Sequence, residues 1–227
     1  MKEIHFTDTN FVDDLVATFL SNFPIALFEF SGIYGLIAVN SIMGCKALNH
    51  TKNRLPNKFY GSFPGDDLNL TSVMKDQPKG NLSHFLTHAE GAILRFPVRG
   101  KNIPNEVICN GAHQFLVETE EVRLKIKNLE EKLLKTFPVS DFFEHNYQAP
   151  LCTSANESGD ANGGILQLKD ALDFGKKKNI PLFIHTGLRK ELSGSYPVIS
   201  VEKESVELVR SGPRGEEILE KLQRNLR

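Results

Sequence analysis

The sequence predicts an α/β fold organised as one domain over residues 1–227. Amphipathic helical segments alternate with short apolar runs of strand length along the chain, and no internal repeat or low-complexity linker interrupts them. The composition is typical of a globular protein, with 40% hydrophobic and 24% charged residues. A chain of this length can form one large domain or two small ones, and the unbroken alternation favours one.

Charge and cysteine content argue against several classes of protein. Lys and Arg total 27 against 28 Asp and Glu, so the surface is not expected to be basic all over. The three cysteines, Cys45, Cys109 and Cys152, lie far apart and form no CxxC pair, which argues against a disulfide framework or a structural zinc site. No secretory signal is recognisable, and the apolar runs are too short to span a membrane. We therefore expect a cytoplasmic protein without membrane contact.

The N-terminal half contains the following expected elements. Residues 10–23 form a helix that Asn10 can cap, with acidic residues in its first turn and one apolar stripe. A strand over residues 24–30 turns at Ser31–Gly32 into the apolar segment 33–38, and a short helix follows from residue 40 to about 48. A polar loop over residues 50–58 comes next. A strand near 59–63, helices near 68–74 and 81–88, and a strand over 92–98 complete this half.

The C-terminal half begins with the clearest helical pattern, over residues 118–137. Its apolar residues recur at i, i+4, i+7 and i+11 as Val122, Ile126, Leu129 and Leu133. Further elements are a helix over 165–178, a buried strand over 180–186, a hairpin of 196–201 with 205–210, and a closing helix over 215–226.

The stretch from residue 150 to 164, PLCTSANESGDANGG, lies between these helices. A short apolar lead-in breaks into hydroxyl, amide and glycine residues, which suit a tight turn rather than a core. A strand that enters such a loop before a helix can present backbone N–H groups and hydroxyls to an anion. Composition alone favours the simpler alternative, an ordinary strand–loop–helix connection.

Five short motifs occur in a characteristic order along the chain. They are YGL at 34–36, KNR at 52–54, TSANESG at 153–159, SYPVIS at 195–200 and VRSG at 209–212. Together they resemble the YrdC-like family, the threonylcarbamoyl-adenylate synthases, over about residues 28–214. The resemblance implies an open, twisted mixed sheet with helices around it and a concave cleft. It also implies an enzyme that uses ATP, L-threonine and bicarbonate and releases threonylcarbamoyl-AMP and pyrophosphate, for the threonylcarbamoyladenosine modification of tRNA.

Residue by residue, the resemblance implies catalytic roles for Lys52 and Arg54. The nucleotide would be bound by these two cations, by Lys58 in the same basic loop, and by Ser154, Asn156, Ser158 and Arg210; Tyr34 and Ser195 would bind the substrate. Attack of a carbamate on the α-phosphate joins two anions, so fixed cations matter more than an acid–base pair. Mg²⁺ is expected to bridge the phosphates of ATP, and no protein metal site is expected. Each residue also has a structural alternative, such as a solvated loop, a strand cap or a partner for a glutamate.

The sequence departs from the family where threonine recognition is expected. Phe30 and Gly32 replace two threonines of the P-T-x-T segment, and Phe63 takes the place of a histidine. The W-P-G-P-L-T segment is not recognisable, and the stretch from 97 to 153 is longer than usual, with the helix at 118–137 filling the excess. The phosphate-binding half of the site is therefore predicted to carry over, whereas the threonine-binding half does not.

Three hypotheses follow for the function. The first is a divergent threonylcarbamoyl-adenylate synthase, and the second is a related enzyme that adenylates a different carbamoyl or carboxylate compound. The third is a non-catalytic module that binds RNA or tRNA through a basic cleft, with affinity that falls steeply with salt. The near-neutral charge makes the third the least favoured. We expect a monomer.

Overall fold

One mixed β-sheet organises the protein. The computed structural model describes residues 1–55, 58–65, 67–99, 107–109, 111–138, 147–160, 163–188 and 194–226. Within these ranges eleven strands form the sheet, ten of them side by side and β6 (Ile108–Cys109) paired only with β7. The ten follow the order β1 (Lys2–His5), β9 (Leu182–His185), β2 (Ile25–Glu29), β3 (Tyr34–Ala38), β8 (Leu151–Ser154), β4 (Gly61–Ser62), β7 (Ala112–Val117), β5 (Ala92–Pro97), β10 (Val198–Val201) and β11 (Val206–Arg210).

Parallel and antiparallel pairings alternate irregularly across this sheet. β9 runs parallel to both β1 and β2, and β4–β7 and β5–β10 are also parallel pairs. The β2–β3, β3–β8, β4–β8, β5–β7 and β10–β11 pairs are antiparallel. The prediction of an open mixed α/β sheet is confirmed.

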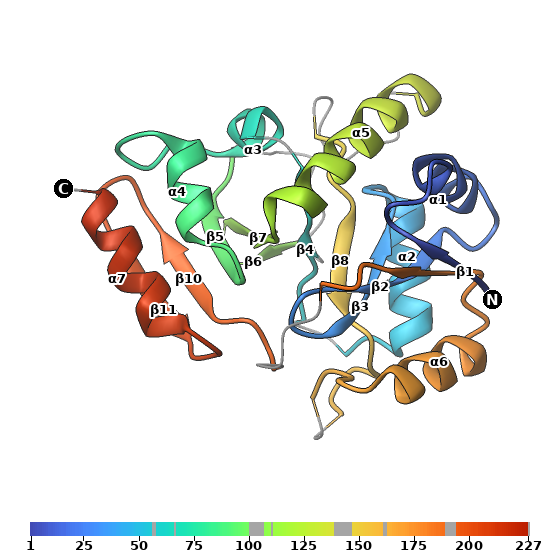
Figure 1. Cartoon of the computed structure of the whole chain (residues 1–227). Coiled ribbons are helices and arrows are strands. Elements are labelled where there is room, and N and C mark those ends of the chain that lie inside the picture. The colour runs from blue at the N-terminus through green and yellow to red at the C-terminus, as the bar shows by residue number, and fades with distance from the viewer. Residues whose placement is uncertain are drawn as a thin grey trace.

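Helices cover both faces of the sheet around β2, β3 and β9 (Figure 1). On one face, α1 (Phe11–Phe19) and α5 (Glu120–Thr136) pack their apolar stripes against strand residues such as Phe28 and Ile37. On the other face, α2 (Ile42–Lys52) and α6 (Leu168–Lys177) cover Leu27 and Leu36. Every residue of β2 and β3 is buried as a result. Burial on both faces explains why these strands are continuous apolar runs.

The sheet around β5, β7 and β10 is covered differently. The helices α3 (Asp67–Val73), α4 (Leu82–His88) and α7 (Gly215–Asn225) lie together in this part of the molecule (Figure 1), and residues from all three share a core with Leu94 and Phe115. Burial alternates along β5, with Ala92, Leu94 and Phe96 buried and the residues between them only partly buried. Period-two alternation therefore directs Ile93 and Arg95 to the opposite, more open face.

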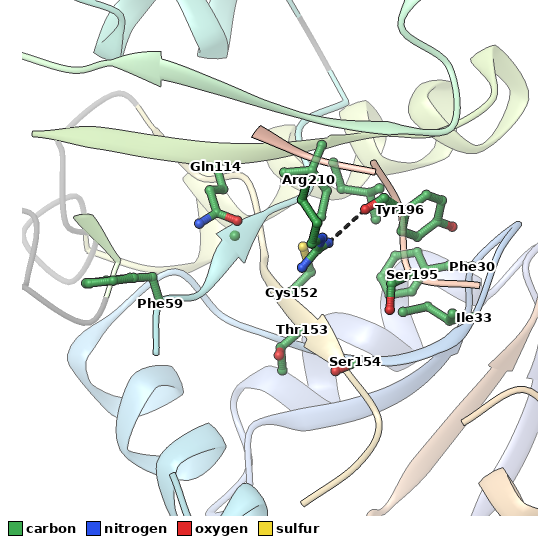
Figure 2. Close-up of a pocket in the computed structure, with 13 residues that line it drawn as sticks. Phe30, Ile33, Phe59, Gln114, Cys152, Thr153, Ser154, Ser195, Tyr196 and Arg210 are labelled. Carbon is green, nitrogen blue, oxygen red and sulfur yellow. Dashed lines mark hydrogen bonds between the residues drawn. The ribbon is translucent and has the colours of Figure 1, made fainter. Parts of the chain in front are cut away.

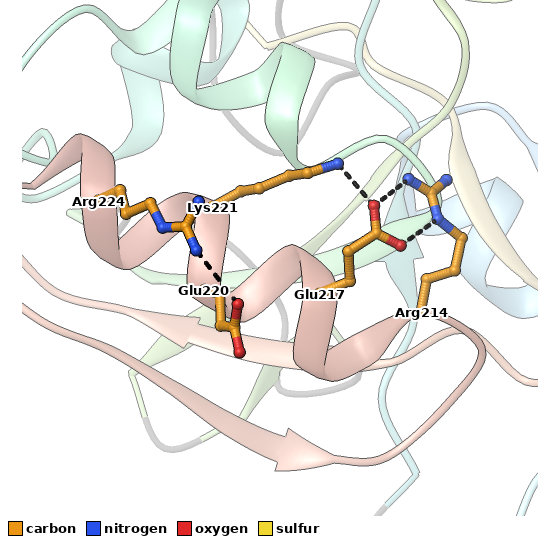
Figure 3. A network of polar contacts seen from close by, with 5 residues as sticks. All are labelled: Arg214, Glu217, Glu220, Lys221 and Arg224. Atoms are coloured by element: carbon orange, nitrogen blue, oxygen red, sulfur yellow. Dashed lines mark hydrogen bonds and ion pairs between the residues drawn. The ribbon is translucent and has the colours of Figure 1, made fainter.

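Helix α7 closes the described chain with a charged outer face (Figure 3). Arg214 donates two hydrogen bonds to the Glu217 carboxylate, each 3.1 Å long, and Lys221 reaches the same carboxylate at 2.6 Å. Arg224 pairs with Glu220 at 3.4 Å. Exposed pairs of this kind contribute little to stability, because solvent screens the charges and the side chains lose freedom when they pair. Apolar burial through Ile218 and Leu222 on the inner face holds the helix instead.

Three expectations about individual elements need correction. Helix α2 continues to Lys52, past the expected end near residue 48, and ends at Asn53 in the left-handed conformation (φ 47°). Lys52 therefore belongs to a helix rather than a loop. Asn10 does not cap α1; its side-chain amide donates to Asp14 instead. The strands β1, β6 and β7 were not expected from the sequence pattern, although β7 is central to the sheet.

None of the helices in the described part of the chain has the length and apolar character needed to cross a bilayer.

Candidate active site

A cavity of about 150 Å³ opens on the less covered face of the sheet (Figure 2). Its floor comes from β4, β5, β7 and β8, through Gly61, Ile93, Gln114, Leu116 and Cys152. Strand register explains the convergence, because Gln114 lies opposite both Gly61 and Arg95, and Gly61 lies opposite Cys152. The remaining lining residues are Phe30, Ile33, Phe59, Thr153, Ser154, Ser195, Tyr196 and Arg210. Residues from seven separate segments of the chain thus line one cavity.

Three of the predicted site residues, Ser154, Ser195 and Arg210, line this cavity. Arg210 ends β11, and its guanidinium donates to the Tyr196 carbonyl oxygen at 2.8 Å (Figure 2). Ser195 precedes β10, and Ser154 ends β8 where the small-residue loop begins. The structure therefore brings one cation and two hydroxyls together from positions far apart in the chain.

Lys52 ties helix α2 to the loop after β8. Its side chain is 2% exposed, and Nζ donates to the Ser154 carbonyl at 2.5 Å, the Asn156 carbonyl at 2.7 Å and the Asn156 side-chain oxygen at 3.1 Å. The Ser154 hydroxyl donates to the same Asn156 oxygen, and the Ser158 amide donates to the Lys52 carbonyl. Lys52, Ser154, Asn156 and Ser158 are thus one connected unit. Lys52 fixes the shape of this loop, and of the four only Ser154 lines the cavity.

The pKa of the Lys52 ammonium is expected to lie far below the usual range for lysine. Burial, together with the positive charge of Arg54, lowers its pKa from 10.5 to about 7. In protein labelled with ¹³C at lysine Cε, one signal should titrate near pH 7, and it should belong to Lys52. Lys52→Met should remove that signal, and Lys46→Met, on the same helix, should not. A Lys52 signal that titrates together with the exposed lysines would contradict the burial argument.

The other predicted residues lie away from the cavity lining. Arg54 donates to the Phe59 carbonyl at 2.7 Å and stacks 4.1 Å from the ring centre of Tyr60, so it supports the wall behind Phe59. Lys58 is exposed. Tyr34 is buried in the cluster on the opposite face of the sheet, edge-on to Phe183 at 6.0 Å.

Arg95 is a second cation near Arg210, and the sequence motifs did not predict it. Arg95 lies on the same face of β5 as Ile93. The pKa of Arg210 is lowered mainly by the burial of Arg210 itself and secondly by the positive charge of Arg95. The Nε of Arg95 is buried without a hydrogen-bond partner. Neither arginine forms an ion pair with a carboxylate of the described residues. An arginine in the cavity lining, with a second positive charge close to it, favours an anionic ligand. A lone arginine in the apolar run AILRFPV was the available signal.

The Phe30 side of the cavity is apolar and rigid. The Phe30 ring is 2% exposed and packs edge-on against Phe63, with ring centres 5.3 Å apart. A Cβ at Gly35 would lie 2.3 Å from the Phe30 ring, so glycine is required there to let the ring lie against β3. Phe30 and Phe63 are the residues that replace a threonine and a histidine of the family pattern. The two rings contact each other directly and fill the space beside β3 at this side of the cavity.

A buried polar network of hydrogen bonds lies at the Phe30 side of the cavity. The Tyr196 hydroxyl donates to Glu118, and the Gly32 amide donates to the Tyr196 oxygen at 2.8 Å. The Ser31 amide also donates to Glu118, at 3.2 Å. Burial raises the pKa of Glu118 above its usual range. A Cβ at Gly32 would approach the Tyr196 ring to 3.1 Å, so Tyr196 occupies the space that a side chain at position 32 would need.

Neither the Cys152 thiol nor the Ser62 hydroxyl is suited to act as a nucleophile. Burial raises the pKa of the Cys152 thiol well above its usual range, which keeps it neutral. Ser62 bonds His113 Nε2 at 2.7 Å, as in a Ser–His pair, but Ser62 is fully buried and His113 is 1% exposed. Because His113 Nδ1 faces the Val107 carbonyl at 2.9 Å, Nδ1 carries the proton and Nε2 accepts from Ser62. This pair is structural.

Comparisons with known proteins identify solved structures with a similar fold. No protein-family model matches the sequence, and no curated protein matches it significantly. Solved structures do match. Pyrococcus abyssi Sua5, in complex with L-threonine, gives a TM-score of 0.71 at 18% identity and covers 100% of this chain. Escherichia coli YciO gives 0.67 at 12% identity, with 96% of each chain covered. A phosphate- and nucleotide-bound HypF gives 0.63 at 14% identity, with 90% of this chain and 29% of HypF covered.

Chain length differs between these proteins. The present chain spans 62% of P. abyssi Sua5, so part of Sua5 has no counterpart here. The similarity to Sua5 and YciO nevertheless extends over nearly the whole described sheet and its helices. The chain therefore has the YrdC-like fold, the open mixed α/β architecture found in Sua5 and YciO.

Proposed function

We propose that this protein is a nucleotidyltransferase of the threonylcarbamoyl-adenylate synthase type, which joins AMP from ATP to a carboxylate. The observation that carries the proposal is the Arg210 guanidinium in the cavity lining, with the charge of Arg95 close to it and no carboxylate partner for Arg210 among the described residues. Thr153, Ser154 and Ser195 add hydroxyls to the same lining. Cations with hydroxyls around them suit phosphate oxygens, and the YrdC-like fold of a nucleotide-bound HypF agrees with that use.

The reaction needs charge stabilisation above all. The acceptor amine combines with bicarbonate to give an N-carboxylate and water. One oxygen of that carboxylate forms a bond to the α-phosphorus of ATP while the bond to the β-phosphate oxygen breaks, and pyrophosphate leaves with the electron pair. Arg210 and Arg95 would lower the repulsion between the two anions. The Ser154–Asn156 loop, held by Lys52, would orient nucleotide oxygens.

Magnesium fits this scheme as a companion of the nucleotide. Within the described residues no group of three or more His, Cys, Asp or Glu could hold a metal ion. Mg²⁺ would therefore be held through the phosphates of ATP, where it neutralises charge on the departing pyrophosphate. The chain's own contribution is the pair of arginines and the fixed loop.

The test is a product assay on purified protein with ATP, Mg²⁺, bicarbonate and an amino acid. L-threonine is the reference acceptor, because Sua5 of the same fold binds it, and threonylcarbamoyl-AMP for tRNA modification would be the product. We expect bicarbonate-dependent release of pyrophosphate together with an N-carbamoyl-AMP product detected by mass spectrometry. ATP binding without pyrophosphate release for any amino acid tested would overturn the proposal.

A further inference from the structure

The acceptor end of the cavity has a chemical character of its own. Figure 2 shows Ser195, Phe30 and Ile33 together on one side of Arg210, opposite Phe59 and Gln114. Ile93 and Leu116 add further apolar lining. Phe30, Ile33 and Leu116 all belong to one buried hydrophobic cluster, and Ile93 packs against it. This end therefore offers a single hydroxyl set in an apolar wall.

That wall is preorganised and does not depend on a ligand for its shape. Phe30 is held between Phe28, at 4.8 Å between ring centres, and Phe63, at 5.3 Å, above a glycine at position 35 that leaves no space for a side chain. The Tyr196 hydroxyl is engaged by Glu118 and Gly32. The Ser154 hydroxyl is engaged by Asn156. Among these hydroxyls Ser195 is the one placed beside the apolar wall to serve a ligand's polar head (Figure 2).

We propose, resting on the adenylyl transfer proposed above, that the acceptor is an amino acid with a branched aliphatic side chain of valine or isoleucine size. Its amino and carboxyl groups would lie at Ser195 and toward Arg210, and its side chain against Phe30 and Ile33. Phe30, Ile33, Ile93 and Leu116 give a side chain of this size an apolar surface to pack against. Valine and threonine have nearly the same shape, so the wall distinguishes them by polarity alone.

The size of the preference follows from the chemistry of the wall. A hydroxyl placed against an aromatic ring and aliphatic side chains loses its hydrogen bond to water without gaining another. A hydrophobic pocket rejects an isostere that adds a hydroxyl by roughly 10- to 100-fold. We therefore expect kcat/KM for pyrophosphate release, and the binding constant in calorimetry, to favour L-valine over L-threonine by about this factor.

The experiment measures binding and turnover separately for L-valine, L-isoleucine and L-threonine, each with ATP, Mg²⁺ and bicarbonate. Preferential binding of valine supports the inference even if no pyrophosphate is released, a result that would count against the proposed function alone. Pyrophosphate release with threonine at least as efficient as with valine would support the proposed function and overturn the inference. Absence of binding and of turnover for all three would overturn both.

Matched variants test whether the wall causes the preference. Ile93→Thr places a hydroxyl on the cavity face of β5 at a partly buried position, where the branched shape at Cβ is kept. It should shift the valine-to-threonine ratio at least several-fold toward threonine. Val209→Thr makes the same kind of change at a residue 47% exposed and outside the cavity lining, and should leave the ratio unchanged. A ratio that moves equally in both variants, or in neither, would overturn the role of the wall.

Discussion

Acidification from pH 6.5 to pH 4 is expected to lower the free energy of unfolding by about 3 kcal/mol through His113 alone. Burial lowers the pKa of this histidine from 6.5 to about 4 in the folded protein. Between these two values the unfolded chain binds a proton that the folded chain does not. Stability from this group is therefore complete above pH 6.5 and is lost as the pH falls toward 4.

The surroundings of His113 explain why its neutral form is required. Its Nδ1–H donates to Val107, and its Nε2 accepts from Ser62, which in turn contacts the Tyr147 hydroxyl. A second proton on the ring would turn Nε2 into a donor and disrupt this chain of hydrogen bonds inside the protein.

A comparison between variants isolates the effect of His113. Urea unfolding between pH 4 and 7 should show a weaker pH dependence in His113→Gln than in the wild type, because glutamine keeps a donor and an acceptor but does not titrate. His50→Gln, at an exposed position of α2, serves as the control and should behave as the wild type. Buried Glu118, whose raised pKa acts in the opposite direction, is present in all three proteins and cancels in the comparison. Equal pH dependence in His113→Gln and the wild type would refute the assignment.

Replacing Arg210 by methionine should weaken ATP binding about 10- to 100-fold. Loss of a charge-assisted contact to phosphate corresponds to roughly 1.5–3 kcal/mol. Methionine keeps much of the aliphatic length, so the cavity wall is retained while the charge is removed.

Calorimetric titration with a non-hydrolysable ATP analogue measures this effect. Arg224→Met is the matched control, because Arg224 is exposed on α7 and its contact with Glu220 lies outside the cavity. The control should bind the analogue as the wild type does. An unchanged affinity in Arg210→Met would mean that the phosphates lie elsewhere, and the proposed function would lose its main support.

Some of the site was predictable because its signals are local in the chain. The loop after Cys152 is recognisable from its small polar residues. The VRSG motif is recognisable because it follows SYPVIS in the expected order. These signals predicted Ser154, Ser195 and Arg210, which the structure places in one cavity. Gln114 had no such marker, and Arg95 had only its single charge in an apolar run. They meet only because β5 and β7 pair in a register that sets them opposite each other.

Roles were harder to predict than positions. Lys52 and Asn156 were expected to bind nucleotide, and in the structure they bind each other, across 104 positions of sequence. The polar pattern of residues 50–58 suggested a loop, because a lysine at the end of a helix looks the same in sequence as one in solvent. Only the approach of the β8 loop to the end of α2 gives Lys52 its three acceptors.

The sequence by itself determined the α/β class, most helices and the small-residue loop after β8, because periodicity and turn chemistry act over a few neighbouring residues. The tertiary structure alone decided that Phe30 and Phe63 pack together, that Tyr196 fills the space beside Gly32, and that the charge of Arg95 lies near Arg210. These contacts join residues that are distant in the chain. Their energies depend on strand register and burial, which arise only when the whole sheet has formed.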